Sequence, residues 1–429
     1  MKVLVVGGGG REHALCLALA RDPQVRSIIC APGNAGTLRI AEPRTLEATD
    51  PRAVADLADA VDADLVVVGP EAPLVAGVAD AVRERGRAVF GPSAAAAQLE
   101  GSKAFAKDVM VAAGVPTAGH WVCGSDDEVA VALDAAGPPY VVKDDGLAGG
   151  KGVAVTADRA KAVSHARACL DKPGGRVVVE EHLAGPEISL FAICDGTAVL
   201  PMQPAQDFKR IGDGDTGPNT GGMGAYSPLL WAPEDLVTTV ARDVLEPTVA
   251  EMARRGTPFT GLLYAGLALT PTGPKVIEFN ARFGDPETQV LLPLLRTPLG
   301  ALLHAAATGG LAGTTLDWSP DAAVTVVMAA GGYPGRPQTG QSIDGLAAAE
   351  SVPGVDVIHA GTRLQDGRVM TDGGRVLAVT ATAGDLSAAR QAAYEAVSRI
   401  HYPGAQWRRD IAEAAAEGRV AVPTPPTLS

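Results

Sequence analysis

Three short apolar runs in the first ninety residues are each followed directly by a loop that contains glycine. The runs are Lys2–Val6, Leu65–Val68 and Ala88–Phe90, and a helical apolar pattern, His13–Ala20, follows the first loop. Repeats of strand and loop, the first leading into a helix, predict a parallel sheet with its loops gathered at the carboxyl ends of the strands. This feature limits the N-terminal part of the chain to an α/β fold.

The first of these loops, Gly7–Gly10, invites comparison with the dinucleotide-binding fingerprint. The comparison fails, because Glu12 stands where the third glycine belongs and the next strand, Ser27–Cys30, ends without an acidic residue. Two interpretations stay open. Free backbone N–H groups at a helix N-terminus, with Arg11 beside them, can hold a phosphate, or the glycines only provide the dihedral angles of a tight turn.

A second glycine-rich loop, residues 144–152, lies between two predicted strands, Tyr140–Lys143 and Val153–Thr156. Its Gly-Lys pair resembles a Walker P-loop, but Gly152 replaces the Ser or Thr that would bind magnesium. A loop of this kind can close over a triphosphate with its backbone amides, as a lid does. An ordinary β-hairpin with a long loop is the alternative, and the glycines with two flanking lysines favour the anion site.

The segment Lys275–Glu287 combines an apolar strand with polar side chains of equal parity. In a strand, Glu278 and Asn280 project from one face, about 7 Å apart along the chain. A carboxylate and an amide oxygen suit Mg²⁺ or Mn²⁺ that is completed by nucleotide phosphates and water. Arg282 shares the parity and could stabilise charge on a metal-bound phosphate, although a plain ion pair between Glu278 and Arg282 is the other interpretation. The preceding strand, Thr260–Thr270, adds no carboxylate.

The segment Gln206–Pro228 is too rich in Gly, Asp and Asn to be a regular element. A loop of this length in a compact protein is usually functional or disordered. Its apolar and aromatic residues Phe208, Met223 and Tyr226 argue against a flexible linker, so we predict a substrate-binding loop.

The 429 residues suffice for two to four domains. A net charge of −13 argues against nucleic acid and acidic membranes as partners, so charges that bind anions must be local. Five scattered cysteines show no zinc or disulfide spacing and no apolar run has membrane-spanning length, so we expect a cytoplasmic protein. Six histidines stand isolated and receive no catalytic role: His120, His165, His182, His304, His359 and His401.

Seven motifs, in this order, closely resemble the phosphoribosylamine–glycine ligase family of purine biosynthesis: GGGGREHAL, APGNAGT, VVGPEAPL, LEGSKAFAKD, DGLAGGKGV, KRIGDGDTGPNTGGMGAYSP and VIEFNARFGDPETQ. The resemblance extends from Met1 to about Ile411. It implies an α/β ATP-grasp fold with an N-terminal parallel-sheet domain, a small lid domain, a metal and substrate domain and a C-terminal α+β domain. The boundaries we expect are 1–103, 104–188, 189–310 and 311–429.

The resemblance also implies a reaction. ATP would phosphorylate the carboxylate of glycine, and the amine of 5-phosphoribosylamine would attack this acyl phosphate to give glycinamide ribonucleotide, ADP and phosphate. Such chemistry needs positioning and neutralised charge more than a covalent nucleophile. The expected cofactors are ATP with Mg²⁺ or Mn²⁺, and we expect no nucleic-acid or membrane partner and a monomer or weak dimer.

The same resemblance assigns roles to individual residues. Glu278 and Asn280 would hold the metal, and Arg282 and Lys143 would act in catalysis. The residues expected to bind ATP are Lys103, Lys143, Gly149, Gly150, Lys151, Gly152, Glu180, Glu181, Leu183 and Glu187. The residues expected to bind the other substrates are Gly9, Gly10, Arg11, Glu12, Asp207, Lys209, Asn219, Thr220, Gly221, Gly222, Met223, Gly224, Asp285 and Pro286.

The chain departs from the family pattern at Gly8, Gly149 and Asp144, where Asn, Ala and a small apolar residue are usual. Asp144 is harmless if it faces away from Lys143, and it weakens ATP binding or recruits extra metal if it faces the phosphates. Three rival interpretations are another carboxylate–amine ligase such as a biotin-carboxylase-like enzyme, an NAD(P)-binding oxidoreductase, and an inactive ATP-binding regulatory module.

Overall fold

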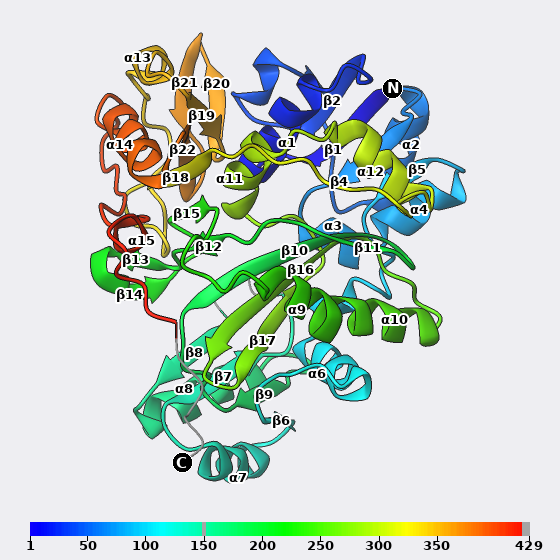
Figure 1. Ribbon diagram of the computed structural model, residues 1–429, viewed down its shortest axis with the longest axis vertical. Coiled ribbons are helices and arrows are strands. Elements are labelled where there is room, and N and C mark those ends of the chain that lie inside the picture. The colour runs from blue at the N-terminus through cyan, green and yellow to red at the C-terminus, as the bar shows by residue number, and fades with distance from the viewer. Residues whose placement is uncertain (148–151, 423–429) are drawn as a thin grey trace.

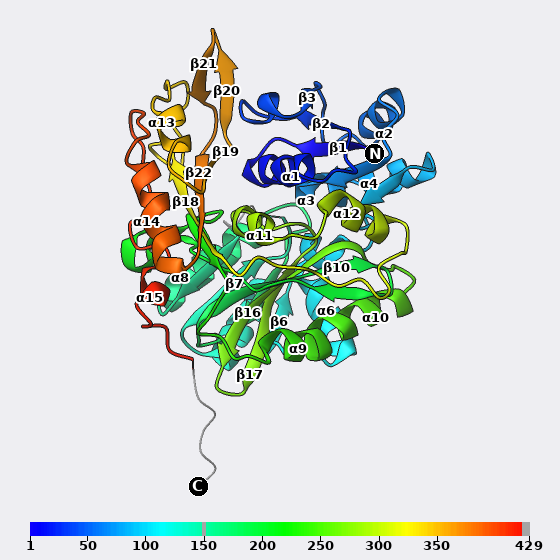
Figure 2. The same ribbon diagram turned by 45° about the horizontal axis from the view of Figure 1, so that its top comes forward.

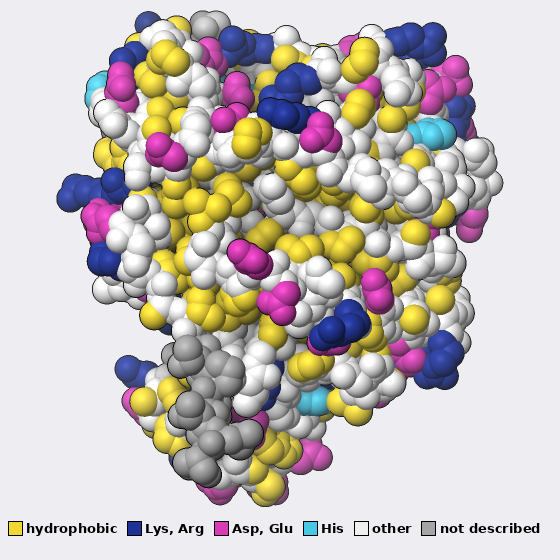
Figure 3. Space-filling view, viewed as in Figure 1, with side chains coloured by type: hydrophobic (Ala, Val, Ile, Leu, Met, Phe, Trp, Pro, Cys, Tyr) yellow, Lys and Arg dark blue, Asp and Glu magenta, His cyan; other side chains and the backbone are white. Residues whose placement is uncertain are grey.

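The computed structural model describes residues 1–147 and 152–422. Four main sheets build the molecule, and Figure 1 shows the N-terminal and C-terminal sheets side by side above a central sheet, with a smaller lid sheet below. Within the described residues, no helix is both long and apolar enough to cross a membrane. Figure 3 shows acidic and basic side chains interspersed over the described part of one face.

The N-terminal sheet is parallel, as predicted, with the strand order β3-β2-β1-β4-β5. Its strands are β1 (Lys2–Gly7), β2 (Ser27–Pro32), β3 (Glu42–Pro43), β4 (Leu65–Val68) and β5 (Ala88–Phe90). Its helices are α1 (Gly10–Ala20), η1 (Thr37–Arg39), α2 (Pro51–Ala60), α3 (Glu71–Val75), α4 (Val78–Glu84) and α5 (Gln98–Gly101). Alternation in β1 buries Leu4 and Val6 in the core shared with α2 and α4, and Val3 and Val5 in the core shared with α1.

Helix α6 (Lys103–Ala113) leads into the lid, a sheet in which β6 and β7 flank β9 and β8 lies beyond β7. The strands are β6 (His120–Cys123), β7 (Tyr140–Asp144), β8 (Val153–Thr156) and β9 (Val177–Glu180), and the helices α7 (Asp126–Ala136) and α8 (Arg159–Leu170) pack on the sheet around one apolar core. The two strands predicted around the glycine-rich loop, β7 and β8, are confirmed as an antiparallel pair.

The central sheet is antiparallel with the order β11-β10-β16-β17. Its strands are β10 (Glu187–Asp195), β11 (Val199–Pro201), β16 (Thr260–Thr270) and β17 (Gly273–Asn280). The helical segments after and beside it are α9 (Leu236–Val240), η3 (Ala241–Leu245), α10 (Glu246–Arg254), α11 (Glu287–Leu294) and α12 (Leu299–Ala307). β16 pairs antiparallel with β17, the strand that carries Glu278 and Asn280.

The C-terminal sheet combines strands from two distant parts of the chain, in the order β12-β15-β18-β22-β19. Its strands are β12 (Gln206–Asp207), β15 (Gly224–Ser227), β18 (Ala322–Ala329), β19 (Val355–His359) and β22 (Arg375–Ala383). Two hairpins, β13 (Arg210–Gly212) with β14 (Thr216–Asn219) and β20 (Thr362–Gln365) with β21 (Arg368–Thr371), accompany it. The remaining helices are η2 (Asp213–Asp215), α13 (Leu346–Glu350), α14 (Leu386–Val397) and α15 (Glu413–Ala416), and Figure 2 shows α14 alongside this sheet.

The prediction that Gln206–Pro228 contains no regular element is wrong. The segment holds four short strands, and β15 pairs with β18 from Gly224↔Val326 to Ser227↔Ala323. Glycine at 224 permits this approach, because a Cβ there would lie 2.7 Å from Thr325 O. The partner strand is about a hundred residues away in the sequence, so local composition could not indicate the pairing.

Candidate active site

A cavity of about 870 Å³ lies where the lid, the central sheet and both outer parts of the molecule meet. Most of the predicted site residues line it, although they come from all four sheets or their connections. They are Arg11, Lys103, Lys143, Gly152, Glu180, Glu181, Leu183, Glu187, Asp207, Lys209, Asn219, Thr220, Gly221, Glu278, Asn280, Arg282 and Asp285. The predicted residues Gly149, Gly150 and Lys151 lie outside the described residues.

The end of β17 brings the two predicted metal ligands into this cavity. Glu278 and Asn280 both line it, and no described residue forms an ion pair with Glu278. Within residues 1–147 and 152–422, no three His, Cys, Asp or Glu side chains converge as a ready-made metal cage. One carboxylate and one amide oxygen fit a magnesium ion that takes its other ligands from phosphates and water.

Arg282 pairs with carboxylates of the N-terminal part and not with Glu278. Its guanidinium lies 2.9 Å from Glu100 Oε1 and 3.2 Å from Glu71 Oε2, and Nη2 donates to Asn280 Oδ1 at 3.3 Å. The alternative of an ion pair with Glu278 is therefore wrong. Burial opposes the charge of Arg282, but Glu100 and Glu71 raise its pKa well above the usual value, so the arginine stays a fixed cation.

A buried carboxylate holds two lysines at the lid side of the cavity. Glu180 Oε1 lies 2.9 Å from Lys143 Nζ, and Glu180 Oε2 lies 2.9 Å from Lys107 Nζ. Lys143 also donates to Ile277 O at 2.7 Å, which joins the lid to β17. Burial lowers the pKa of Lys107 to about 8. Burial alone would raise the pKa of Glu180, but the charges of Lys143 and Lys107 outweigh it and lower that pKa.

The carboxylate of Asp144 turns away from Lys143. Neighbouring strand residues alternate, and the Asp144 carboxylate pairs with Lys172 instead of turning towards Lys143. Asp144 does not line the cavity in the part of the chain that the structure describes. Of the two interpretations of Asp144, the geometry supports the one in which it is harmless because it faces away from Lys143. Lys103 donates to Gly146 O at 3.0 Å, at the start of the same loop.

A second group of charges lies on the wall formed by β10 and β12. Lys209 Nζ is 2.9 Å from Glu187 Oε2 and 3.6 Å from Asp207 Oδ1. Burial raises the pKa of Asp207 to about 7, although Lys209 opposes the shift, and Glu287 and Glu187 add to it. Glu287 is itself buried and accepts a hydrogen bond from Tyr264 Oη at 2.7 Å.

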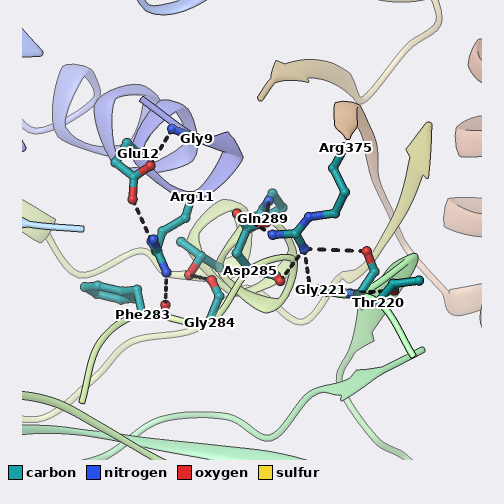
Figure 4. Close-up of polar contacts among 12 residues, drawn as sticks. Gly9, Arg11, Glu12, Thr220, Gly221, Phe283, Gly284, Asp285, Gln289 and Arg375 are labelled. Carbon is teal, nitrogen blue, oxygen red and sulfur yellow. Dashed lines mark hydrogen bonds and ion pairs between the residues drawn. The ribbon is translucent and has the colours of Figure 1, made fainter. Parts of the chain in front are cut away.

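The turn Gly284–Pro286 is held between the first helix and the C-terminal sheet (Figure 4). Arg375, at the start of β22, lies 3.2 Å from Asp285 Oδ2 and donates to Gly221 O at 2.5 Å and to Asp285 O at 2.6 Å. Arg11 donates to Phe283 O at 3.0 Å. Burial raises the pKa of Asp285, whereas the positive charges of Arg375 and Arg11 lower it. The net effect is a pKa below the usual value for this carboxyl.

Glu12 is a buried carboxylate that holds the loop between β1 and α1. It is 1% exposed, accepts from Gly9 N at 2.5 Å and lies 2.6 Å from Arg11 Nε. A Cβ at Gly69 would lie 2.0 Å from Glu12 Oε1, so the loop after β4 requires glycine to admit this carboxylate. The other predicted substrate residues that do not line the cavity are Gly9, Gly10, Gly222, Met223, Gly224 and Pro286.

Sequence reasoning missed several charged residues of the site. Glu71, Glu100 and Lys107 stand inside or beside the quoted motifs VVGPEAPL and LEGSKAFAKD, so the motifs could have suggested them. Arg375 follows a plain Asp-Gly-Gly turn, and no local pattern distinguishes it from a surface arginine.

His359 is not isolated, contrary to the prediction. The backbone N–H of His359 donates to Nδ1 of His13 at 2.8 Å, and the two ring centroids are 5.6 Å apart. Burial, with His359 and Arg39 nearby, lowers the pKa of His13 to about 3, and burial lowers that of His359 to about 4. The pair joins α1 to β19 as neutral side chains, away from the residues that line the cavity.

Three family models match consecutive parts of the chain. They are the N domain of phosphoribosylglycinamide synthetase at residues 1–100, its ATP-grasp (A) domain at 101–288 and its C domain at 323–414.

Relatives match over almost the whole length. The phosphoribosylamine–glycine ligase of Streptomyces coelicolor is 63% identical over 419 residues, covering 97% of this chain and 100% of the relative. That of Mycobacterium tuberculosis is 56% identical, covering 98% and 100%. The crystal structure of phosphoribosylamine–glycine ligase from Thermotoga maritima superposes with a TM-score of 0.83 at 33% identity, covering 96% and 100%.

A biotin carboxylase domain from Hydrogenobacter thermophilus, crystallised with MgADP and bicarbonate, shares only the fold, with a TM-score of 0.72 at 16% identity and coverage of 95% and 91%. The expected ATP-grasp architecture is thus confirmed, and the far closer matches favour the ligase over the rival interpretations. The chain belongs to the phosphoribosylamine–glycine ligase family, ATP-dependent carbon–nitrogen ligases of purine biosynthesis.

Proposed function

We propose that this ligase joins glycine to 5-phosphoribosylamine through a glycyl phosphate formed inside the cavity. A carboxylate oxygen of glycine attacks the γ-phosphorus of ATP, and ADP leaves. The amine nitrogen of phosphoribosylamine then attacks the carbonyl carbon, the bond from carbon to the phosphate oxygen breaks, and the nitrogen gives up a proton. One glycine oxygen leaves with the phosphate.

One observation carries the proposal. Glu278, Asn280 and Arg282 line the same cavity as Lys143, whose Nζ reaches the backbone of the metal strand at Ile277. Anionic phosphates placed there would meet fixed positive charge that is shielded from water, and such charge lowers the barrier to phosphoryl transfer. A divalent cation held by Glu278 and Asn280 would neutralise further phosphate charge.

The remaining assignments are part of the same proposal. ATP is bound by the lid residues and by Glu187, whose carboxylate suits ribose hydroxyls. Arg11, Asp285 and the loop that begins at Asp207 bind glycine and phosphoribosylamine. Magnesium is the preferred metal, with manganese as a substitute, and the working form is a cytoplasmic monomer or weak dimer. Closure of the lid limits hydrolysis of the acyl phosphate.

Isotope transfer tests the route. Glycine labelled with oxygen-18 in its carboxylate is incubated with ATP, Mg²⁺ and freshly generated phosphoribosylamine, and the released phosphate is examined by mass spectrometry. One labelled oxygen in each phosphate is the expected result. Unlabelled phosphate, with the product still formed, would refute the glycyl phosphate. Omitting glycine is the control and should abolish ADP release.

A further inference from the structure

The hairpin β13–β14 carries part of the cavity wall, and its internal contacts are a short strand pair with hydrogen bonds from Arg210 to Gly217 O and from Thr216 to Asp213 O. Residues 213–218 are exposed, and Gly214 and Asp215 adopt left-handed backbone angles, with φ of 64° and 53°. An isolated two-stranded hairpin is at best marginally stable in water. Arg210, Asp215 and Asn219 of this hairpin nevertheless line the cavity. Some other part of the chain must therefore fix the hairpin.

Arg408 supplies that contact from near the C-terminus. Its side chain is 1% exposed, and Nε and Nη2 donate to the two carboxylate oxygens of Asp410 at 2.8 and 2.6 Å. Nη1 donates to Asp215 Oδ1 at 2.6 Å and to Arg210 O at 3.3 Å. The guanidinium also lies over the ring of Phe208, 4.8 Å from its centroid. One arginine thus touches the hairpin at its base and at its tip.

Asp410 strengthens this contact, and helix α14 fixes both residues. Asp410 Oδ2 accepts a hydrogen bond from Gly214 N at 2.8 Å. Tyr394 in α14 donates its hydroxyl to Arg408 O at 2.9 Å and accepts from Ile411 N at 3.1 Å. We call Arg408 and Asp410 the C-terminal clasp. The C-terminal clasp is hydrogen-bonded to α14 through Tyr394. It contacts the hairpin at backbone atoms of Arg210 and Gly214 and at the side chain of Asp215.

Lys209 is the residue whose position depends on the clasp. It stands between Phe208 and Arg210, both of which Arg408 contacts, and its own side chain turns into the cavity towards Glu187. Its carbonyl accepts from Thr220 N at 2.7 Å, so the backbone at Lys209 is held from two sides. A shift of the hairpin would move this ammonium group relative to whatever anion it meets.

We propose that Arg408 is a positioning residue for ligation, which sets the place of Lys209 and the β13–β14 hairpin without touching a substrate itself. The inference rests on the proposed assignment of the loop from Asp207 to glycine and phosphoribosylamine. A guanidinium is needed because a lysine cannot contact two carboxylates and a carbonyl in one plane and cover an aromatic ring at the same time.

Steady-state kinetics of Arg408→Met test the proposal, with Arg399→Met as the matched control. Arg399 also pairs with a carboxylate and a carbonyl, but it follows the end of α14 and its side chain is 35% exposed. We expect the KM for glycine or phosphoribosylamine to rise at least fivefold in Arg408→Met, with kcat changed less than twofold. Partial misfolding would lower kcat and leave KM unchanged. Unchanged KM values for both substrates would overturn the proposal.

Two further measurements separate the possible failures. Lys209→Met tests the underlying assignment: if it leaves both KM values unchanged, the loop does not bind these substrates and the assignment falls. If Lys209→Met raises either KM and Arg408→Met does not, the loop binds these substrates but Arg408 does not position it. Asp215→Asn removes the negative charge on the hairpin side of the ion pair and leaves Arg408 and Asp410 unaltered, and we expect faster hydrogen exchange in residues 208–219 with no change in α14. Exchange like that of the wild type in both Asp215→Asn and Arg408→Met would also refute the clasp.

Discussion

The buried pair His13 and His359 predicts a steep loss of stability in mild acid. In the unfolded chain each imidazole binds a proton with a pKa near 6.5, whereas in the folded chain the values are about 3 and about 4. Unfolding therefore takes up protons below pH 6.5. The contribution of the pair is fully present above that value and is lost as the pH falls towards the folded pKa values.

Between pH 7 and pH 5 the free energy of unfolding falls by on the order of 2 kcal/mol for each histidine, or about 4 kcal/mol for the pair. This is a large part of the stability of an ordinary domain, which is about 5–15 kcal/mol. Urea unfolding at the two pH values measures it. Carboxylates also respond to acid, so the informative quantity is the difference between the wild type and a variant without the pair.

The variant His13→Asn/His359→Asn is suited to this comparison. The amide oxygen of asparagine can replace Nδ1 as the acceptor of the hydrogen bond from the backbone of residue 359, and it does not titrate. We expect the wild type to lose about 4 kcal/mol more than this variant on going from pH 7 to pH 5. His401→Gln, at an exposed position, should behave like the wild type. Equal pH dependence in the wild type and the double variant would refute the reasoning.

Three shorter predictions concern the cavity. Glu278→Ala should abolish ADP release while leaving the thermal unfolding midpoint near that of the wild type, because the described residues offer this carboxylate no ion pair; substantial turnover would place the metal elsewhere. Asp144→Ala should leave the KM for ATP within about twofold of the wild type, because the carboxylate pairs with Lys172; a large fall would mean that it opposes the triphosphate. Arg375→Met should lower kcat/KM at least tenfold, on the order of 1.4 kcal/mol, because it frees the turn at Asp285 from the loop at Gly221, and wild-type kinetics would exclude this role.

Much of the fold could be predicted from local signals. An apolar run that ends in glycine predicts a strand leading into a loop, and β1, β4 and β5 all follow that pattern. Parity along one strand was enough to place Glu278 and Asn280 together in the cavity, because side-chain direction in a strand is fixed by the backbone alone.

The rest depended on contacts between distant residues. Arg282 has its partners at Glu71 and Glu100, in another sheet domain, so its sequence neighbours suggested a different pair. His13 looked like an ordinary residue of an apolar helix, and its partner lies at the far end of the chain. Isolated charged or aromatic residues carry no periodicity, and only the folded backbone decides which of them meet.

The mixed origin of the C-terminal sheet also constrains how the enzyme is made. Strand β15 leaves the ribosome well before β18, and synthesis of the stretch between Ser227 and Ala322 takes roughly 5–20 s at typical rates. During that interval β15 has a free edge, and the hairpin that Arg408 will grip has no partner. A nascent chain already carries the metal strand, but its substrate wall is assembled only when the last segment emerges. A chain that ends before Ala322 lacks the partner strand of β15, and one that ends before Arg408 lacks the side chain that contacts this hairpin.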